Sequence, residues 1–73
     1  MMDYDDMRMK IRHLRLERRM TQKQLAEVTG IAQADISRFE NGTGNPSLRT
    51  LERLADGLGM RLKVEFVPKK PTA

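Results

Sequence analysis

The feature that most constrains the fold of this chain is a glycine between two short helix-like segments. Thr21 and Gln24 match a capping box, in which each side chain bonds the backbone of the other residue at a helix start. Gly30 is placed to end that helix, because glycine readily adopts the left-handed backbone found at helix ends. A second helical pattern follows almost at once, over residues 33–40. The segment therefore predicts two short helices that meet at a tight turn.

Two more helices are predicted, one before and one after this pair. The first covers residues 5–19. The fourth opens with Asn45 as its cap and Pro46 at the first helical position, and Gly59 ends it. The apolar faces expected at helical spacing are Met7, Ile11 and Leu14 in the first helix, Leu25, Ala26 and Val28 in the second, and Leu48, Leu51, Leu54, Ala55 and Leu58 in the fourth. Together they predict a compact all-α domain.

The hydrophobic period changes after Gly59. Residues 60–67 alternate apolar and mostly charged side chains, which predicts a half-buried strand that Pro68 stops. Its apolar face comprises Met60, Leu62, Val64 and Phe66. A lone strand after four helices has no partner in its own chain, so we expect it to pair with the same strand of a second copy in a homodimer. The alternatives are that it packs back on its own domain or is disordered.

The chain is a small single domain without a covalent staple. Its 73 residues contain no cysteine, which excludes disulfides and Cys-based metal sites, and the lone His13 cannot form a metal site by itself. A domain of this size buries only about 60% of the surface that its unfolded chain exposes, which favours self-association. No apolar run is long enough for a membrane span or a signal-peptide core, so we expect a cytoplasmic protein with no cofactor and no membrane partner.

Positive charge gathers in the first third of the chain. The formal net charge is +4, and seven basic residues stand between Arg8 and Lys23 against one acidic residue, Glu17. Such an asymmetry favours a polyanionic partner. The alternative is a solvated, arginine-rich helix.

The helix over residues 33–40 has two unlike faces. At 100° per residue, Ile36 and Phe39 fall on one side and would pack on the domain. The other side presents an amide, a methyl, a hydroxyl and a guanidinium, the groups that read base edges in the major groove. They belong to Gln33, Ala34, Ser37 and Arg38. The alternative is an ordinary polar surface with one arginine.

A family resemblance rests on matches in residue type and spacing across about residues 7–59. They are Thr21-Gln22, Leu25-Ala26, Gly30-Ile31, Ile36-Ser37-Arg38-Phe39-Glu40-Asn41-Gly42 and Pro46-Ser47-Leu48. These motifs resemble the phage-repressor and Cro-type helix-turn-helix family, also called the Xre family. The resemblance implies a lambda-repressor-like four-helix domain whose helix over residues 33–40 enters the major groove of double-stranded DNA.

The resemblance also implies roles for single residues. Gln33, Ala34, Ser37 and Arg38 would contact bases, and Gln22 would contact a phosphate and brace Gln33. The full set expected at the DNA backbone is Gln22, Lys23, Asn41, Thr43 and Asn45, with Gly44 in the same loop. Arg15 and Glu40 match a buried ion pair that fixes geometry. Ala32 departs from the family's usual Ser or Thr cap, and Asp35 could compensate by bonding back to it or could accept from a cytosine amine.

The function implied is a sequence-specific transcriptional repressor that binds a palindromic operator as a homodimer. The segment Leu58-Gly59-Met60-Arg61-Leu62-Lys63-Val64 is similar to antitoxins of the HipB and HigA types, which implies a toxin protein as a further partner and repression of the protein's own operon. The alternative is an interaction module that neutralises a toxin without reading DNA. A membrane-surface or RNA-binding peptide is disfavoured because only two Phe and one Tyr are present.

No enzyme is expected, because no paired acid and base, activated nucleophile or phosphate loop stands in the sequence. The predicted organisation is a flexible N-terminus over residues 1–5, a DNA-binding domain over residues 6–59, a dimerisation strand over residues 60–67 and a disordered tail over residues 68–73.

Overall fold

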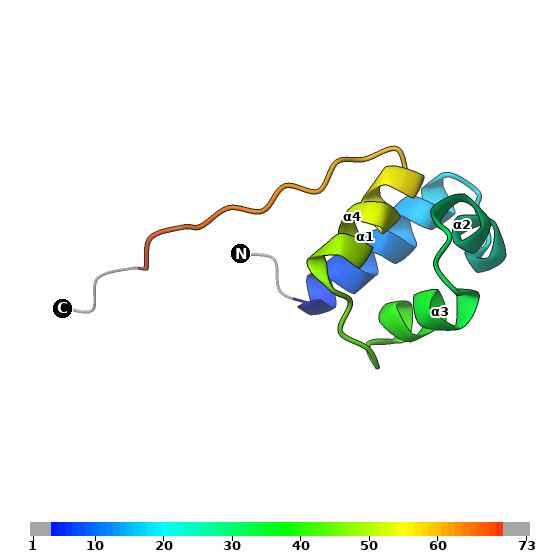
Figure 1. Cartoon of the computed structure of the whole chain (residues 1–73), viewed down its shortest axis with the longest axis horizontal. Coiled ribbons are helices and arrows are strands. Elements are labelled where there is room, and N and C mark those ends of the chain that lie inside the picture. The colour runs from blue at the N-terminus through cyan, green and yellow to red at the C-terminus, as the bar shows by residue number, and fades with distance from the viewer. Residues whose placement is uncertain (1–3, 70–73) are drawn as a thin grey trace.

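The computed structural model describes residues 4–69 and folds them into four helices (Figure 1). These are α1 (Tyr4–Glu17), α2 (Gln22–Thr29), α3 (Gln33–Asn41) and α4 (Leu48–Gly57). α2 packs against α3 and α4, and α1 packs against α3. The predicted four-helix architecture is therefore confirmed. The predicted flexible N-terminus and disordered tail lie largely outside the described residues.

The core forms where the apolar faces of all four helices meet. Its buried members are Ile11, Leu25, Ile31, Ile36, Leu51, Leu54 and Leu58, with Met7, Leu14, Ala26 and Phe39 packed against them. Val28 and Leu48 are exposed, so their predicted burial is wrong. On α2 it is Thr29, not Val28, that is buried. The Thr29 hydroxyl donates to the Leu25 carbonyl at 2.7 Å, so this polar group is not left unpaired in the core. Leu48 is the first residue of α4 and projects beyond the core.

The C-terminal end of α1 differs from the prediction by two residues. α1 ends at Glu17 rather than at Arg19, because Arg19 adopts a left-handed conformation (φ 54°). The amide of Met20 then donates to the Arg15 carbonyl at 3.0 Å, and the amide of Arg19 donates to the Leu16 carbonyl at 3.0 Å. This pair of bonds is the Schellman motif, which satisfies the last carbonyls of a helix.

The start of α4 also requires a correction, since Asn45 is not its cap and Pro46 is not its first residue. Ser47 is the cap: its hydroxyl accepts from the Thr50 amide at 3.1 Å. Pro46 is buried in the loop before the helix. The predicted Asn-Pro start was two residues early because Ser47 offers an equally good cap, and sequence alone does not rank the two.

Residues 60–69 leave the end of α4 as an extended segment that runs away from α2 and α3 (Figure 1). Leu62 is half-buried against the core, whereas Val64 and Phe66 are exposed. No strand is formed within residues 4–69, because an extended segment becomes a strand only beside another one. Pairing with a second copy stays a prediction.

Candidate nucleic-acid interface

The outer face of α3 presents the four side chains expected to read bases. Gln33, Ala34 and Arg38 are exposed and Ser37 is half-buried, while Ile36 on the opposite face is buried. The helix is only nine residues long and lies at an edge of the domain (Figure 1). A short helix with a polar outer face can enter a major groove. Contact with bases stays a prediction.

Arg15 and Glu40 fix the position of this helix relative to α1. The Arg15 guanidinium donates to both Glu40 carboxylate oxygens, each at 2.8 Å, and the two residues are only 8% and 3% exposed. Arg15 also donates to the Met20 carbonyl at 2.8 Å. The hydrogen bond to Glu40 raises the pKa of Arg15 above its ordinary value, against the opposing effect of burial. Charged groups buried in this way orient elements more than they stabilise them.

Gln22 adds α2 to the same network. Its amide nitrogen donates to a Glu40 carboxylate oxygen at 3.3 Å, although we expected it to brace Gln33. Gln22 is the first residue of α2, and the Thr21 hydroxyl caps the helix as predicted, with Gln24 completing the capping box. Glu40 therefore ties the first residue of α2 to α1 and α3. The rest of the Gln22 side chain is half-exposed at the same edge as α3.

Arg38 and Asp35 pair with each other on the exposed face of α3. The guanidinium of Arg38 donates to an Asp35 carboxylate oxygen one turn earlier, and the two side chains are 61% and 40% exposed. The side chain of Ala32 cannot cap the helix, and the side-chain contact found for Asp35 is with Arg38. The pair holds the charged end of Arg38 over the outer face of the helix.

The loop after α3 is held by a second Schellman motif. Gly42 has a left-handed backbone (φ 79°), and both the amide and the hydroxyl of Thr43 donate to the Arg38 carbonyl, at 2.9 and 3.3 Å. The Asn41 side chain donates to the Ser37 hydroxyl at 3.4 Å. The hydroxyl of Thr43 is thus occupied by the backbone in the free protein, whereas Asn45 and Lys23 are exposed.

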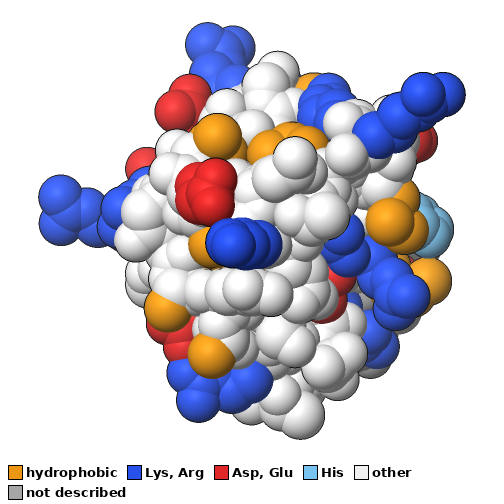
Figure 2. Space-filling view, turned by 90° about the vertical axis from the view of Figure 1, so that its right-hand side faces the viewer, with side chains coloured by type: hydrophobic (Ala, Val, Ile, Leu, Met, Phe, Trp, Pro, Cys, Tyr) orange, Lys and Arg blue, Asp and Glu red, His pale blue; other side chains and the backbone are white. Residues whose placement is uncertain are grey.

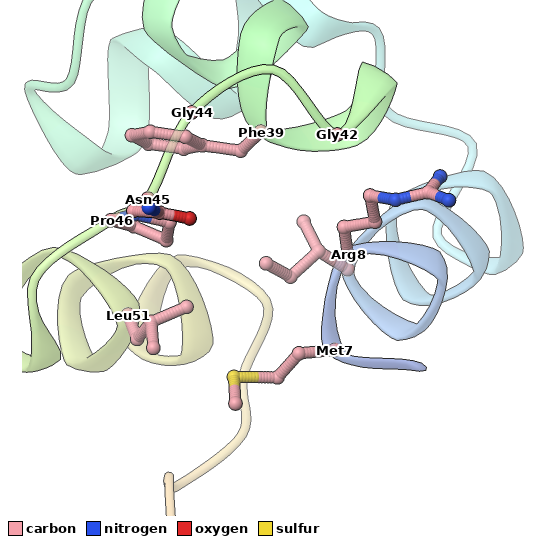
Figure 3. Close-up of a pocket in the computed structure, with 9 residues that line it drawn as sticks. Met7, Arg8, Phe39, Gly42, Gly44, Asn45, Pro46 and Leu51 are labelled. Atoms are coloured by element: carbon pink, nitrogen blue, oxygen red, sulfur yellow. The ribbon is translucent and has the colours of Figure 1, made fainter. Parts of the chain in front are cut away.

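Arg8 supports this loop from α1 and was missed as a site residue by sequence reasoning. It donates to the Glu40 carbonyl at 3.2 Å, at the negative end of α3. Arg8 and Gly44 line a hollow of about 160 Å³ under the loop, in which Gly44 lies close to the Phe39 ring (Figure 3). The only sequence signal for Arg8 was the run of basic residues, because its partner is 32 positions away.

The side of the molecule that carries α2 and α3 is rich in basic side chains. Figure 2 shows most lysines and arginines around the margins of a mainly uncharged surface, with a basic side chain near its centre beside an acidic patch. This distribution suits contact with phosphates on both sides of a central polar area. In the part of the chain that the structure describes, no helix is long and apolar enough to cross a membrane.

Comparison with known proteins identifies a family and several relatives with similar sequences. The model of a family described as Helix-turn-helix matches residues 11–64. The immunity repressor protein of Bacillus phage phi105 is 40% identical over 53 residues, which are 73% of this chain and 37% of that protein. The HTH-type transcriptional repressor RghR of Bacillus subtilis is 47% identical over 49 residues, which are 66% of this chain and 36% of that protein.

A third relative matches over most of its length. An uncharacterized HTH-type transcriptional regulator of Archaeoglobus fulgidus is 36% identical over 61 residues, which are 84% of this chain and 87% of that protein. This chain therefore spans little more than a third of the two Bacillus proteins and most of the archaeal one.

Proposed function

The chain belongs to the helix-turn-helix family of phage-repressor and Cro-type (Xre) regulators, and from this premise we propose that it is a sequence-specific DNA-binding transcriptional repressor. The observation that carries the proposal is the outer face of α3, where Gln33, Ala34 and Arg38 are exposed on a helix fixed from behind by buried Glu40. The names of its relatives, two repressors and a transcriptional regulator, support the same function.

In this proposal α3 reads bases in the major groove. Arg38 donates to the two acceptors of a guanine, Gln33 pairs with an adenine, and the methyl of Ala34 contacts that of a thymine. Ser37 lies between them and can bond either kind of base. Because the guanidinium has donors beyond the one that contacts Asp35, Asp35 can orient Arg38 while Arg38 donates to a guanine, which links base recognition to that ion pair.

Phosphate contacts flank the reading helix. Lys23 is exposed in the first turn of α2 and Asn45 in the loop after α3, and the other expected phosphate contacts, Gln22, Asn41 and Thr43, lie close to them in sequence. Contacts to the backbone set the register on DNA but carry no sequence information. Because each one releases bound counterions, affinity falls steeply as salt rises.

We further propose that the protein acts as a homodimer on a palindromic operator. The exposed apolar residues Val64 and Phe66 on the extended C-terminal segment support this, since they need a partner surface. A two-fold axis would place the two copies of α3 about 34 Å apart, one turn of DNA, and would favour an operator of two inverted half-sites.

A gel-shift titration with the DNA upstream of the gene tests the proposal. The wild-type chain should remain bound to this DNA at a salt concentration that already releases it from a scrambled fragment of the same length. Arg38→Ala serves as the matched control, because the side chain is exposed and its loss leaves the core intact. Equal affinity for both fragments at every salt concentration would refute sequence-specific binding.

An antitoxin role is the finer part of the proposal. It rests on the similarity of residues 58–64 to HipB- and HigA-type antitoxins, whereas the names of the relatives describe regulation only. The test is whether the product of the adjacent reading frame, co-expressed with this chain, co-purifies with it and is inhibited by it. A complex that forms while the chain binds no DNA would favour the alternative of a toxin-neutralising module.

A further inference from the structure

An apolar hollow of about 220 Å³ lies between α1, α4 and the segment over residues 60–63. Its floor is apolar and its rim carries basic side chains. The apolar lining residues are Met7, Ile11, Leu14, Leu51, Ala55, Leu58, Met60 and Leu62, and the basic ones are Lys10, Arg61 and Lys63. The hollow is large enough for an aromatic side chain.

The apolar face of the C-terminal segment starts in this hollow and continues beyond the domain. Leu62 is half-buried at its edge, whereas Val64 is 62% exposed and Phe66 is fully exposed. Phe66 stands about 14 Å further along an extended chain than Leu62, at about 3.4 Å per residue. In this conformation the fully exposed Phe66 therefore lies too far along the segment to fill the hollow of its own domain.

We propose that Phe66 of a second copy fills this hollow, in an antiparallel pair of C-terminal segments centred on Val64. The inference rests on the proposed homodimer and specifies its register and its occupied surface. With Val64 on the two-fold axis, the numbers of any two residues that face each other across the strands add up to 128. Leu62, at the edge of the hollow, then lies opposite Phe66 of the second copy.

Charge and apolar pattern both select this register. Lys63 lies opposite Glu65 of the second copy, and Val64 lies opposite Val64 of the second copy, so that opposite charges face each other on one side and apolar groups on the other. Lys63 and Glu65 of one copy already form an ion pair at 2.7 Å on that side of the segment. The two copies would extend it into a ladder of four alternating charges.

Neighbouring registers are disfavoured for specific reasons. Centring the pair on Lys63 places two lysines opposite each other, and centring it on Glu65 places two glutamates opposite each other. A shift of one strand by one residue makes the facing residue numbers add up to an odd value, and it places apolar residues opposite charged ones on both sides of the ribbon. The incoming segment also brings Glu65 to the basic rim formed by Lys10, Arg61 and Lys63.

Single cysteines test the register, because the natural chain has none. Under oxidation Val64→Cys should form a covalent dimer faster than Val67→Cys, by on the order of tenfold or more, since only residues with Cα atoms closer than about 7 Å can be bridged. Val67→Cys is the matched control, because Val67 is exposed outside the hollow and residues 67 of the two copies would be about 20 Å apart. Faster bridging of Lys63→Cys or Glu65→Cys than of Val64→Cys would overturn the register.

Isotope-filtered NMR tests the occupant of the hollow. In an equimolar mixture of methionine-methyl-labelled and unlabelled full chains, intermolecular contacts are expected between the Phe66 ring and the methyls of Met7 and Met60. Phe66→Leu should remove these ring contacts, and the variant should still form the dimer but with lower affinity. Contacts found only within one copy, or between copies without Phe66, would overturn the inference.

These tests separate the inference from the proposed function. If the dimer uses another surface, the cysteine and NMR results fail while Arg38-dependent binding to a palindromic operator persists. If the protein does not read DNA, operator binding fails while the Val64→Cys bridge and the Phe66 contacts remain.

Discussion

Arg15 and Glu40 form a two-point ion pair that joins α1 to the C-terminal end of α3, with both N–O distances at 2.8 Å and both residues nearly buried. The same carboxylate accepts from Gln22 at the start of α2. Three helices thus meet at one acidic group behind the proposed reading face. The orientation of α3 depends on this group as much as on apolar packing.

Removing one partner of this pair should destabilise the domain strongly. Glu40→Gln leaves Arg15 buried without its counter-charge, and we expect a loss of about 3–5 kcal/mol in the free energy of unfolding. The double variant Arg15→Met with Glu40→Leu should recover most of the loss. Urea unfolding followed by circular dichroism measures both, and equal instability of the single and double variants would contradict this reading.

The pH dependence of this pair follows from the raised pKa of Arg15. A group whose pKa is raised in the folded state contributes stability that is present below its unfolded pKa and lost as pH rises through the folded one. For an arginine that window lies above about pH 12. The unfolding free energy of the wild-type chain should therefore show no loss from Arg15 between about pH 7 and 10.

Replacing Gln22 separates its structural bond from its proposed phosphate contact. Gln22→Ala removes one hydrogen bond to a charged group and should cost about 1.5–3 kcal/mol of stability, and it should lower the affinity for every DNA sequence by a similar factor. Gln22→Glu should destabilise more, because it sets a second carboxylate beside Glu40. A change in base preference by Gln22→Ala would show that this residue reads sequence instead.

Arg38→Ala should cost about 1–3 kcal/mol of operator affinity and relax specificity at one base pair. The same change should alter unfolding free energy by less than about 0.5 kcal/mol, because exposed ion pairs contribute little to stability. Asp35→Ala is the matched variant, since it frees Arg38 and removes a negative charge near the DNA. We expect it to strengthen binding to random DNA. Selection on a library of operators measures the base preference of each variant, and a titration with random DNA measures its non-specific affinity.

Gly57 tests how closely α4 approaches α2. A Cβ added at Gly57 would lie 2.5 Å from the Thr29 methyl, so Gly57→Ala should destabilise by about 1–3 kcal/mol although alanine is the better helix former. Thr29→Ser removes that methyl and keeps the hydroxyl that bonds the Leu25 carbonyl. In the Thr29→Ser background Gly57→Ala should therefore cost less, or stabilise, in a thermal unfolding experiment.

Local patterns carried much of the prediction for this chain. The capping box at Thr21, the glycine turn at Gly30 and the division of α3 into apolar and polar faces are set by residues within one or two turns of each other, so sequence periodicity reveals them. The error at α4 is of the same local kind. Asn45 and Ser47 are both good caps, and the burial of Pro46 in the loop decides between them.

Contacts between residues far apart in the chain could not be predicted from the sequence. Arg8 caps α3 from 32 positions away, and Arg53 donates to the Thr29 carbonyl at the end of α2 at 2.7 Å, 24 positions away. Charged residues at such separations carry no periodic signal that pairs them. The link between Gln22 and Glu40 has the same origin, since it appears only when the start of α2 meets the end of α3.

The sequence by itself determined the four helices, their turns and the polar outer face of α3, because hydrophobic periodicity and capping chemistry act over a few neighbouring residues. The tertiary structure decided what holds that face in place and what lies exposed. It placed one buried carboxylate, Glu40, at the junction of three helices, and it left Phe66 beyond the reach of its own core. Both outcomes depend on how the helices pack, which single segments do not specify.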